Sequence, residues 1–197
     1  MYKFFYRVFF QRIEAENAHK LGIFFLKYFH CFFKFRAKKQ EVDFFGKKLP
    51  NRLGIAAGFD KNGEAIKGLF NLGFGFVEIG TVTPKAQQGN PRPRIFRVGE
   101  MEGIINRMGF PNHGALRTLE NLKKFKSKGA GVVGVNIGRN KDGTEEDYFH
   151  LIEYFIKDAD YIAINISSPN TEGLRDMQKE AELSSFLAKI KEKRAGL

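Results

Sequence analysis

Beyond Pro50, short apolar runs alternate with longer polar stretches that have helical spacing. Four runs are predominantly apolar, rich in β-branched residues and bounded by Gly or polar residues, and they predict buried strands at 53–56, 75–79, 132–137 and 161–166. The stretches after them predict helices at 64–72, 113–126, 144–157 and 181–193. Strands that alternate with helices build a parallel sheet. The pattern therefore predicts serial β/α architecture, an α/β fold class, for this part of the chain.

The first forty residues follow a different pattern, that of two amphipathic helices. Lys20, Lys27, His30 and Lys34 project from one side of the second helix, and apolar residues recur on the other at i, i+3, i+4 and i+7. This apolar face comprises Leu21, Phe24, Phe25, Tyr28, Phe32 and Phe35. A first helix is predicted at 2–13, with 14–18 joining the two as an antiparallel pair. The uncharged run 21–26 is far shorter than the roughly 18 residues that a membrane-spanning helix needs.

The charge of the chain is concentrated in the same segment. The net charge is +11, from 33 Lys and Arg against 22 Asp and Glu, and residues 1–40 carry +7 of it together with ten of the 22 Phe. Basic, aromatic-rich helices are typical of segments that lie in a membrane interface, although packing against the rest of the protein is an alternative. We expect a peripheral location on the cytoplasmic side of the cell membrane. A secretory signal is disfavoured because Glu14 and Glu16 interrupt the segment, and the single Cys31 requires no oxidising compartment.

Polar residues gather directly after each predicted strand, where parallel α/β sheets bind their ligands. These segments are 58–63 (GFDKNG), 80–84 (GTVTP), 136–140 (NIGRN) and 165–171 (NISSPNT), and 105–110 (INRMGF) lies between the second and third strands. A single Asn at a strand end is more often a turn residue. Several that converge suit a planar heterocycle with alternating N–H and C=O groups, because each Asn offers donors and an acceptor.

Two other kinds of site are disfavoured. The stretch 129–134 (GAGVVG) matches the dinucleotide-binding G-x-G-x-x-G spacing, but it precedes a predicted strand instead of following one and opening a helix. No metal site is predicted, because His19, His30, His113 and His150 are scattered and Cys31 is solitary.

Together these segments resemble the dihydroorotate dehydrogenases, in particular the membrane-associated, quinone-using class 2. The resemblance is carried by 56–61 (AAGFDK), 80–84 (GTVTP), 89–94 (GNPRPR), 106–110 (NRMGF) and 165–171 (NISSPNT), and it runs from about Phe9 to the chain end. It implies a (β/α)8 TIM barrel with FMN at its carboxyl face. The implied reaction oxidises (S)-dihydroorotate to orotate in de novo pyrimidine (UMP) biosynthesis, with ubiquinone or menaquinone as the electron acceptor. It also implies an access segment for the membrane and quinone at 1–40 and a barrel portion at 41–197.

The resemblance also implies roles for individual residues. The flavin would contact Ala57, Gly58, Lys61, Thr81, Asn136 and Asn165. The substrate would contact Lys61, Asn106, Arg107, Met108, Gly109, Phe110, Asn165 and Asn170. Ser168 would be the catalytic base, which needs a partner to relay its proton because a hydroxyl alone is a poor base. His19 and Arg97 are candidates for the quinone head group, although His19 could equally cap the helix pair and Arg97 could be an ordinary surface arginine.

Two departures from the family pattern change the expectation. Pro111 stands where many relatives place an Asn, so one hydrogen bond to substrate is either absent or supplied by Asn112. A barrel of this kind takes about 250 residues, whereas 147 remain from Asn51 onward. We therefore expect about the first half of a barrel, without the later loops that commonly bind phosphate, and no activity from such a half alone.

Two other functions stay open. A basic FMN barrel that acts on RNA is disfavoured, and no nucleic-acid partner is expected, because the excess charge lies beside Phe clusters and is not spread along a barrel face. A non-catalytic, membrane-binding segment without a cofactor is the third hypothesis.

Overall fold

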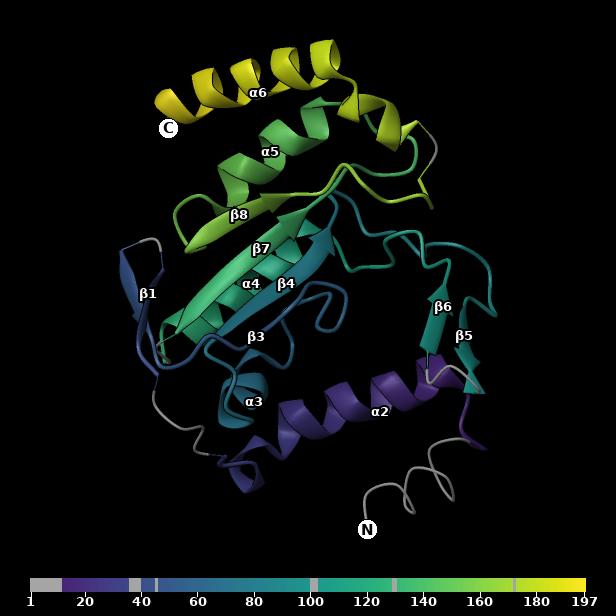
Figure 1. Ribbon diagram of the computed structural model, residues 1–197, viewed down its shortest axis with the longest axis vertical. Helices are drawn as coiled ribbons and strands as arrows, with labels where there is room; N and C mark the ends of the chain where they lie inside the picture. Colours follow the sequence, from purple (N-terminus) through teal and green to yellow (C-terminus); the bar gives the residue numbers. More distant parts are fainter. Residues whose placement is uncertain (1–11, 36–39, 45, 100–102, 129–130, 172) are drawn as a thin grey trace.

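A four-stranded parallel sheet forms the centre of the protein (Figure 1). The computed structural model describes residues 12–35, 40–44, 46–99, 103–128, 131–171 and 173–197. The strands are β3 (Gly54–Ile55), β4 (Phe76–Val82), β7 (Val132–Ile137) and β8 (Tyr161–Ile164), and they neighbour one another in that order. All three pairings are parallel, as successive β/α units require.

One helix follows each strand, as the polar and apolar pattern predicts. These are α3 (Ile66–Asn71), α4 (Ala115–Lys126), α5 (Glu146–Phe155) and α6 (Glu180–Ala195). The largest difference from the sequence prediction is in β4, which continues to Val82 because Gly80 and Val82 still pair with β7. β7 begins at Val132, inside the glycine-rich stretch 129–134, so the stretch runs into a strand and does not open a helix, and the inverted context inferred for it is confirmed in its described part.

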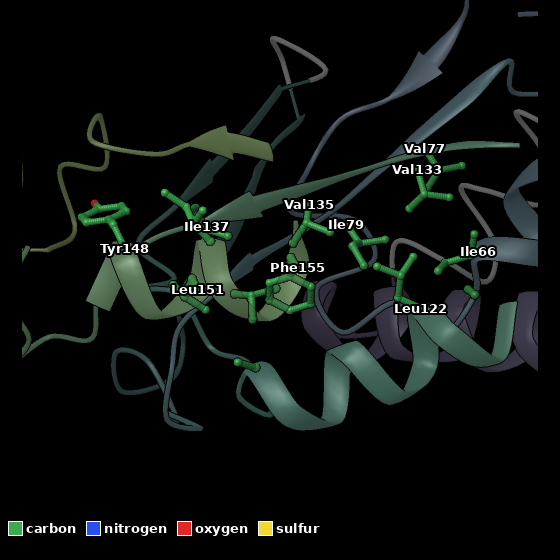
Figure 2. Packing of buried hydrophobic residues seen from close by; sticks show 14 of the residues in the cluster. Ile66, Val77, Ile79, Leu122, Val133, Val135, Ile137, Tyr148, Leu151 and Phe155 are labelled. Carbon is green, nitrogen blue, oxygen red and sulfur yellow. The ribbon is translucent and has the colours of Figure 1, made fainter. Parts of the chain in front are cut away.

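The hydrophobic core lies between the sheet and these helices. Figure 2 shows Ile79 and Val135 of the sheet packed beside Leu122 of α4 and Leu151 and Phe155 of α5. All five side chains are fully buried. Alternate residues of β4 point into this core, which leaves the residues between them facing the opposite side of the sheet.

Two antiparallel hairpins were not predicted from the sequence. The hairpin of β1 (Val42–Phe44) and β2 (Lys47–Leu49) lies at the amino-terminal end of the sheet, where Phe44 stacks on Phe76 with ring centroids 5.3 Å apart. The hairpin of β5 (Ile95–Val98) and β6 (Gly103–Asn106) lies near the start of helix α2 (Figure 1). Strands of three or four mixed residues are too short to show a clear period of two.

The N-terminal helix α2 spans Ala15–Tyr28 and is followed by the 3₁₀ turn η2 (His30–Phe32). The prediction of a link at 14–18 is wrong, because the Glu14 carboxylate caps the helix there by accepting the N–H groups of Glu16 and Asn17 at 3.0 and 2.9 Å. The helix also ends before Phe32 and Phe35. The helix predicted at 2–13 lies outside the described residues, apart from its last two positions. Within the described ranges, no helix is long and apolar enough to cross a membrane.

A buried ion pair attaches α2 to the rest of the protein. Glu16 is 4% exposed, and its carboxylate accepts hydrogen bonds from Arg94 at 2.7 and 2.9 Å and from Arg92 at 2.7 Å. Further along the helix, Leu26 is buried against α3, where a Cβ on Gly68 would lie 2.3 Å from the Leu26 carbonyl oxygen. The helix is therefore packed closely on the β/α unit that carries the first strand end.

Candidate functional site

A cavity of about 550 Å³ opens at the carboxyl ends of the strands. The loops that follow β3 and β8 contribute to its wall, as do residues within β4 and β7, the β5–β6 hairpin and α2. The predicted site residues in its lining are His19, Ala57, Gly58, Lys61, Thr81, Arg97, Asn106, Met108, Gly109, Phe110, Asn136, Asn165, Ser168 and Asn170. Residues from six separate elements thus share one cavity.

Arg107 is the predicted substrate contact that the structure does not bring into this lining. Its side chain is exposed, and its Nε and Nη2 atoms donate to the Pro93 carbonyl oxygen at 3.2 and 3.0 Å. The two residues next to Arg107 line the cavity. The guanidinium is instead used to hold the segment against the start of β5.

A hydrogen-bonded cluster of Thr81, Asn136 and Asn165 joins three strand ends. The Thr81 hydroxyl donates to Asn136 Oδ1 at 2.7 Å, and Asn165 Nδ2 donates to Thr81 Oγ1 at 3.0 Å and to Asn136 Oδ1 at 3.2 Å. Thr81 and Asn136 are the last residues but one of β4 and β7, and Asn165 directly follows β8, so only the sheet brings the three together. We call these three residues the amide cluster.

Glu78 lies beneath the amide cluster, and sequence reasoning missed it. It lines the cavity, and its Oε1 atom accepts a hydrogen bond from Asn136 Nδ2 at 2.9 Å. The signal in the sequence is a carboxylate inside the otherwise apolar run 75–79. Buried strands of parallel sheets are nearly continuously hydrophobic, so a charge within one marks a position of interest.

Lys61 brings an amine to the cavity on the loop after β3. Its Nζ atom donates to the Gly58 carbonyl oxygen at 2.6 Å, and burial is the main cause that lowers the pKa of Lys61. The buried Asp60 carboxylate shapes this loop by accepting the N–H groups of Glu64 and Ala65 at 2.8 and 2.7 Å. Burial raises the pKa of Asp60, and those two N–H bonds oppose the rise. Asp60 is therefore a structural residue that presents its neighbour.

Ser168 lies on the loop after β8, held in place from both ends. Its Oγ atom accepts the N–H of Asn170 at 3.2 Å. The start of the loop is tied to the core through the Tyr148 hydroxyl, which donates to the Asn165 carbonyl oxygen at 2.8 Å. Arg175 of η4 (Leu174–Gln178) donates to the Ser167 carbonyl oxygen at 3.2 Å. The cavity thus has a hydroxyl at a restrained position.

The segment 106–112 forms another wall, and its backbone is strained. Gly109 and Phe110 both have positive φ, 66° and 51°, which is unusual for an aromatic residue. Asn112 does not provide the free amide considered from the sequence. It is 4% exposed, donates to Thr83 Oγ1 and to the Phe110 carbonyl oxygen at 2.8 Å each, and accepts the Gly114 N–H at 2.8 Å. Those contacts hold the turn, because a buried amide needs its partners inside the protein.

His19 and Arg97 border the cavity on the side of α2. His19 Nε2 lies 2.6 Å from the Phe59 carbonyl oxygen, and burial lowers the pKa of His19. Arg97 Nη1 donates to the Ile13 carbonyl oxygen at 2.7 Å and is partly buried. His19 therefore lies where α2 meets the loop after β3, and Arg97 lies where the β5–β6 hairpin meets the residues before α2.

Comparisons with known proteins agree with one another. A family model described as dihydroorotate dehydrogenase matches residues 39–196. A protein named dihydroorotate dehydrogenase (quinone) from Rhodopseudomonas palustris is 53% identical over 186 residues, covering 92% of this chain and 50% of that protein. One of the same name from Dechloromonas aromatica is 44% identical over 202 residues, covering 97% and 58%.

Solved structures give the same result. The ligand-free DHODH from Eimeria tenella superposes with a TM-score of 0.86 at 37% identity, covering 93% of this chain and 54% of that one. The complex of the Eimeria tenella protein with ferulenol gives a TM-score of 0.83 at 38% identity, covering 90% and 50%. The chain spans about half the length of the relatives it matches, and its four parallel β/α units form part of a TIM barrel, as expected.

Proposed function

Because the chain belongs to the dihydroorotate dehydrogenase family, we propose that it contributes the site of an enzyme that oxidises (S)-dihydroorotate to orotate with FMN and passes the electrons to a quinone. One observation carries this proposal. Lys61, Asn106, Asn165 and Ser168, which lie far apart in the sequence, line a single cavity. An amine, two amides and a hydroxyl suit a pyrimidine ring that carries N–H and C=O groups and a carboxylate.

The cavity wall suits a flat ring such as that of FMN. Ala56, Ala57 and Gly58 bring little side-chain bulk to it, and no heavy atom lies within 4 Å of the place where a Cβ on Gly58 would be. Thr81 and Asn136 offer polar groups beside that open backbone. FMN, when bound, supplies the acceptor for the hydride that leaves the substrate. In this proposal the residues around it are Ala57, Gly58, Lys61, Thr81, Asn136 and Asn165.

The substrate would lie against the amides and the amine, with Ser168 as the base. Asn106, Asn165 and Asn170 would hydrogen-bond the pyrimidine ring, and the Lys61 amine would attract its carboxylate. Ser168 Oγ would take the proton from one ring carbon as the hydride leaves its neighbour, which forms the C=C bond of orotate. The Asn170 N–H holds Oγ in place and leaves the hydroxyl proton available for relay to solvent.

The quinone and the membrane would meet the protein at α2. His19 and Arg97 lie on the α2 side of the cavity, where a quinone head group, from ubiquinone or menaquinone, would accept hydrogen bonds. Aromatic side chains of α2 and the segment after it are exposed, with 60% for Tyr28, 79% for Phe32 and 76% for Phe35. Exposed aromatic residues among lysines favour a peripheral membrane surface, here on the cytoplasmic side.

The activity is best tested in a protein with a complete barrel. A hybrid enzyme joins this chain to the part of the Rhodopseudomonas palustris protein that lies outside the match. We expect it to bind FMN and to reduce both a soluble dye and a quinone with dihydroorotate as donor. Ser168→Ala should lower dihydroorotate oxidation by at least about 100-fold, whereas its visible flavin absorbance should remain.

The first of three outcomes would reject this function, the second would reject the role of Ser168 alone, and the third would favour another function. A folded hybrid without flavin would favour the non-catalytic membrane-binding hypothesis. A flavin-loaded hybrid with full turnover after Ser168→Ala would remove Ser168 from the mechanism. Salt-sensitive binding of the chain to RNA, without binding to anionic vesicles, would favour the RNA-modifying alternative instead.

A further inference from the structure

Glu78 is a carboxylate at the floor of the cavity for which the proposed reaction has no role. In β4, Val77 and Ile79 are fully buried on the helix side of the sheet, so Glu78 points to the other side and lines the cavity. Beneath it, Phe44 of β1 packs edge-on against Tyr161 with ring centroids 5.6 Å apart. Glu78 therefore lies between an aromatic layer and the amide cluster.

Tyr161 and Asn136 both donate hydrogen bonds to the Glu78 carboxylate. Asn136 Nδ2 donates to Oε1 and the Tyr161 hydroxyl donates to Oε2, each at 2.9 Å. The absence of a side chain at Gly134 allows this, because a Cβ there would lie 2.1 Å from Tyr161 Cζ. Burial, followed by the nearby Glu78 charge, raises the pKa of Tyr161, so its hydroxyl stays a donor.

The carboxylate decides the orientation of the amide cluster. An ionised carboxylate can only accept, whereas an amide can present either its oxygen or its NH₂ group to a neighbour. Asn136 must therefore turn its NH₂ group toward Glu78 and its Oδ1 toward Thr81 and Asn165. Asn165 then donates from Nδ2 to Thr81 Oγ1 and to Asn136 Oδ1, and its own Oδ1 accepts the Ser167 N–H and the Ser167 hydroxyl, each at 3.2 Å.

We propose that Glu78 is a positioning residue that gives the amide cluster one hydrogen-bond polarity, so that the lone pair of Thr81 Oγ1 that the cluster leaves unused can accept a ring N–H of the ligand. Both isoalloxazine and dihydroorotate carry such an N–H, flanked by carbonyl groups. The identity of the ligand rests on the proposed function. The polarity itself rests on the carboxylate and is testable without any ligand.

The test follows the side-chain amide signals of Asn165 in the ¹⁵N-labelled chain by NMR. Glu78→Gln keeps the shape of the side chain but removes its acceptor-only character, so the Asn136 amide can face either way. We expect shifted Asn165 NH₂ signals and hydrogen exchange about five- to tenfold faster, although residue 78 does not bond Asn165. Tyr161→Phe is the matched control, because it keeps the carboxylate and its bond to Asn136 and should leave the Asn165 signals in place.

A double variant reverses the chemistry and should restore the polarity. In Glu78→Gln with Asn136→Asp, residue 78 can donate to a carboxylate at 136, which again offers only acceptors to Thr81 and Asn165. The net charge equals that of the parent. We expect the Asn165 signals and exchange rates of this variant to return toward those of the parent.

Two outcomes would overturn the proposal. The first is unchanged Asn165 signals in Glu78→Gln. The second is a double variant whose circular dichroism equals that of the parent but whose Asn165 signals do not return to those of the parent. If both variants fail to fold, nuclear Overhauser effects in the unchanged chain decide, because the Asn136 NH₂ protons must lie near the Glu78 side chain.

Titration with FMN then separates this proposal from the proposed function. In the hybrid enzyme, Glu78→Gln should weaken FMN binding about tenfold, with recovery in the double variant. An unaltered FMN affinity in a variant with altered Asn165 signals would overturn the ligand part of the inference. If the parent hybrid takes up no FMN while the NMR results follow expectation, the proposed function fails and the positioning role stands.

Discussion

Replacement of the buried Glu16 carboxylate should cost stability in a pH-dependent way. Its bonds with Arg94 and Arg92 lower the pKa of Glu16 from 4.5 to about 2, the side-chain hydrogen bond from Arg94 being the largest cause. A difference of about 2.5 pKa units corresponds to about 3 kcal/mol of folding free energy. Because the folded-state pKa is the lower one, this contribution is complete above about pH 5 and is lost as the pH falls toward 2. About 2 kcal/mol of it should be gone at pH 3.

Urea unfolding of the chain at pH 7 and pH 3 measures this effect. Glu16→Gln should lower the free energy of unfolding at pH 7 by about 3 kcal/mol, because two arginines lose a buried carboxylate. The parent should then lose about 2 kcal/mol more than the variant between pH 7 and pH 3. Glu14→Gln is the matched control, since it removes the same charge at an exposed position of the same helix and should cost about 1 kcal/mol or less at pH 7. Equal losses in acid for the parent and Glu16→Gln would refute the argument.

Three further predictions concern the core, the sheet and the surface. Phe155→Ala should lower the free energy of unfolding by about 3–5 kcal/mol, because the ring is fully buried. Leu116→Ala, at a 62% exposed position, should lower it by about 0.5 kcal/mol or less. Equal losses of the two variants in thermal or urea unfolding would contradict the packing. Gly134→Ala should lower the free energy of unfolding by about 1–3 kcal/mol, because the new Cβ would overlap Tyr161. Gly22→Ala, which has no atom within 4 Å of the new Cβ, should raise it by up to about 1 kcal/mol by stabilising α2. Calorimetry of both variants tests the two predictions. Phe32→Ser should reduce co-sedimentation of the chain with anionic vesicles several-fold, because it removes a 79% exposed ring that would insert into the membrane interface. Leu116→Ser should leave co-sedimentation unchanged. Equal effects of the two variants would contradict membrane binding by the exposed aromatic residues.

Local patterns were sufficient for the β/α framework. The run at 132–137 is apolar at each buried position of β7, and 113–126 carries its apolar residues on one face, so period and burial agree within these segments, whereas β8 is a strand as predicted but only partly buried. The same chemistry favoured a polar site at the strand ends. Parallel strands all bring their carboxyl ends to one edge, and that rule needs no knowledge of side-chain contacts.

Other features depend on contacts between residues distant in the sequence. The sequence alone does not distinguish Asn112 from Asn136. In the folded chain, packing buries Asn112 within a turn, whereas Asn136 lies in the cavity wall. Arg107 stands between two cavity residues and still binds the Pro93 carbonyl. In the sequence, Glu16 serves only to disfavour a secretory signal, whereas in the folded chain its carboxylate accepts hydrogen bonds from Arg94. Hydrophobic periodicity is a property of neighbours along the chain, whereas the partner of a polar group is chosen across space, and for that reason only the folded chain shows which amides and charges remain for a ligand.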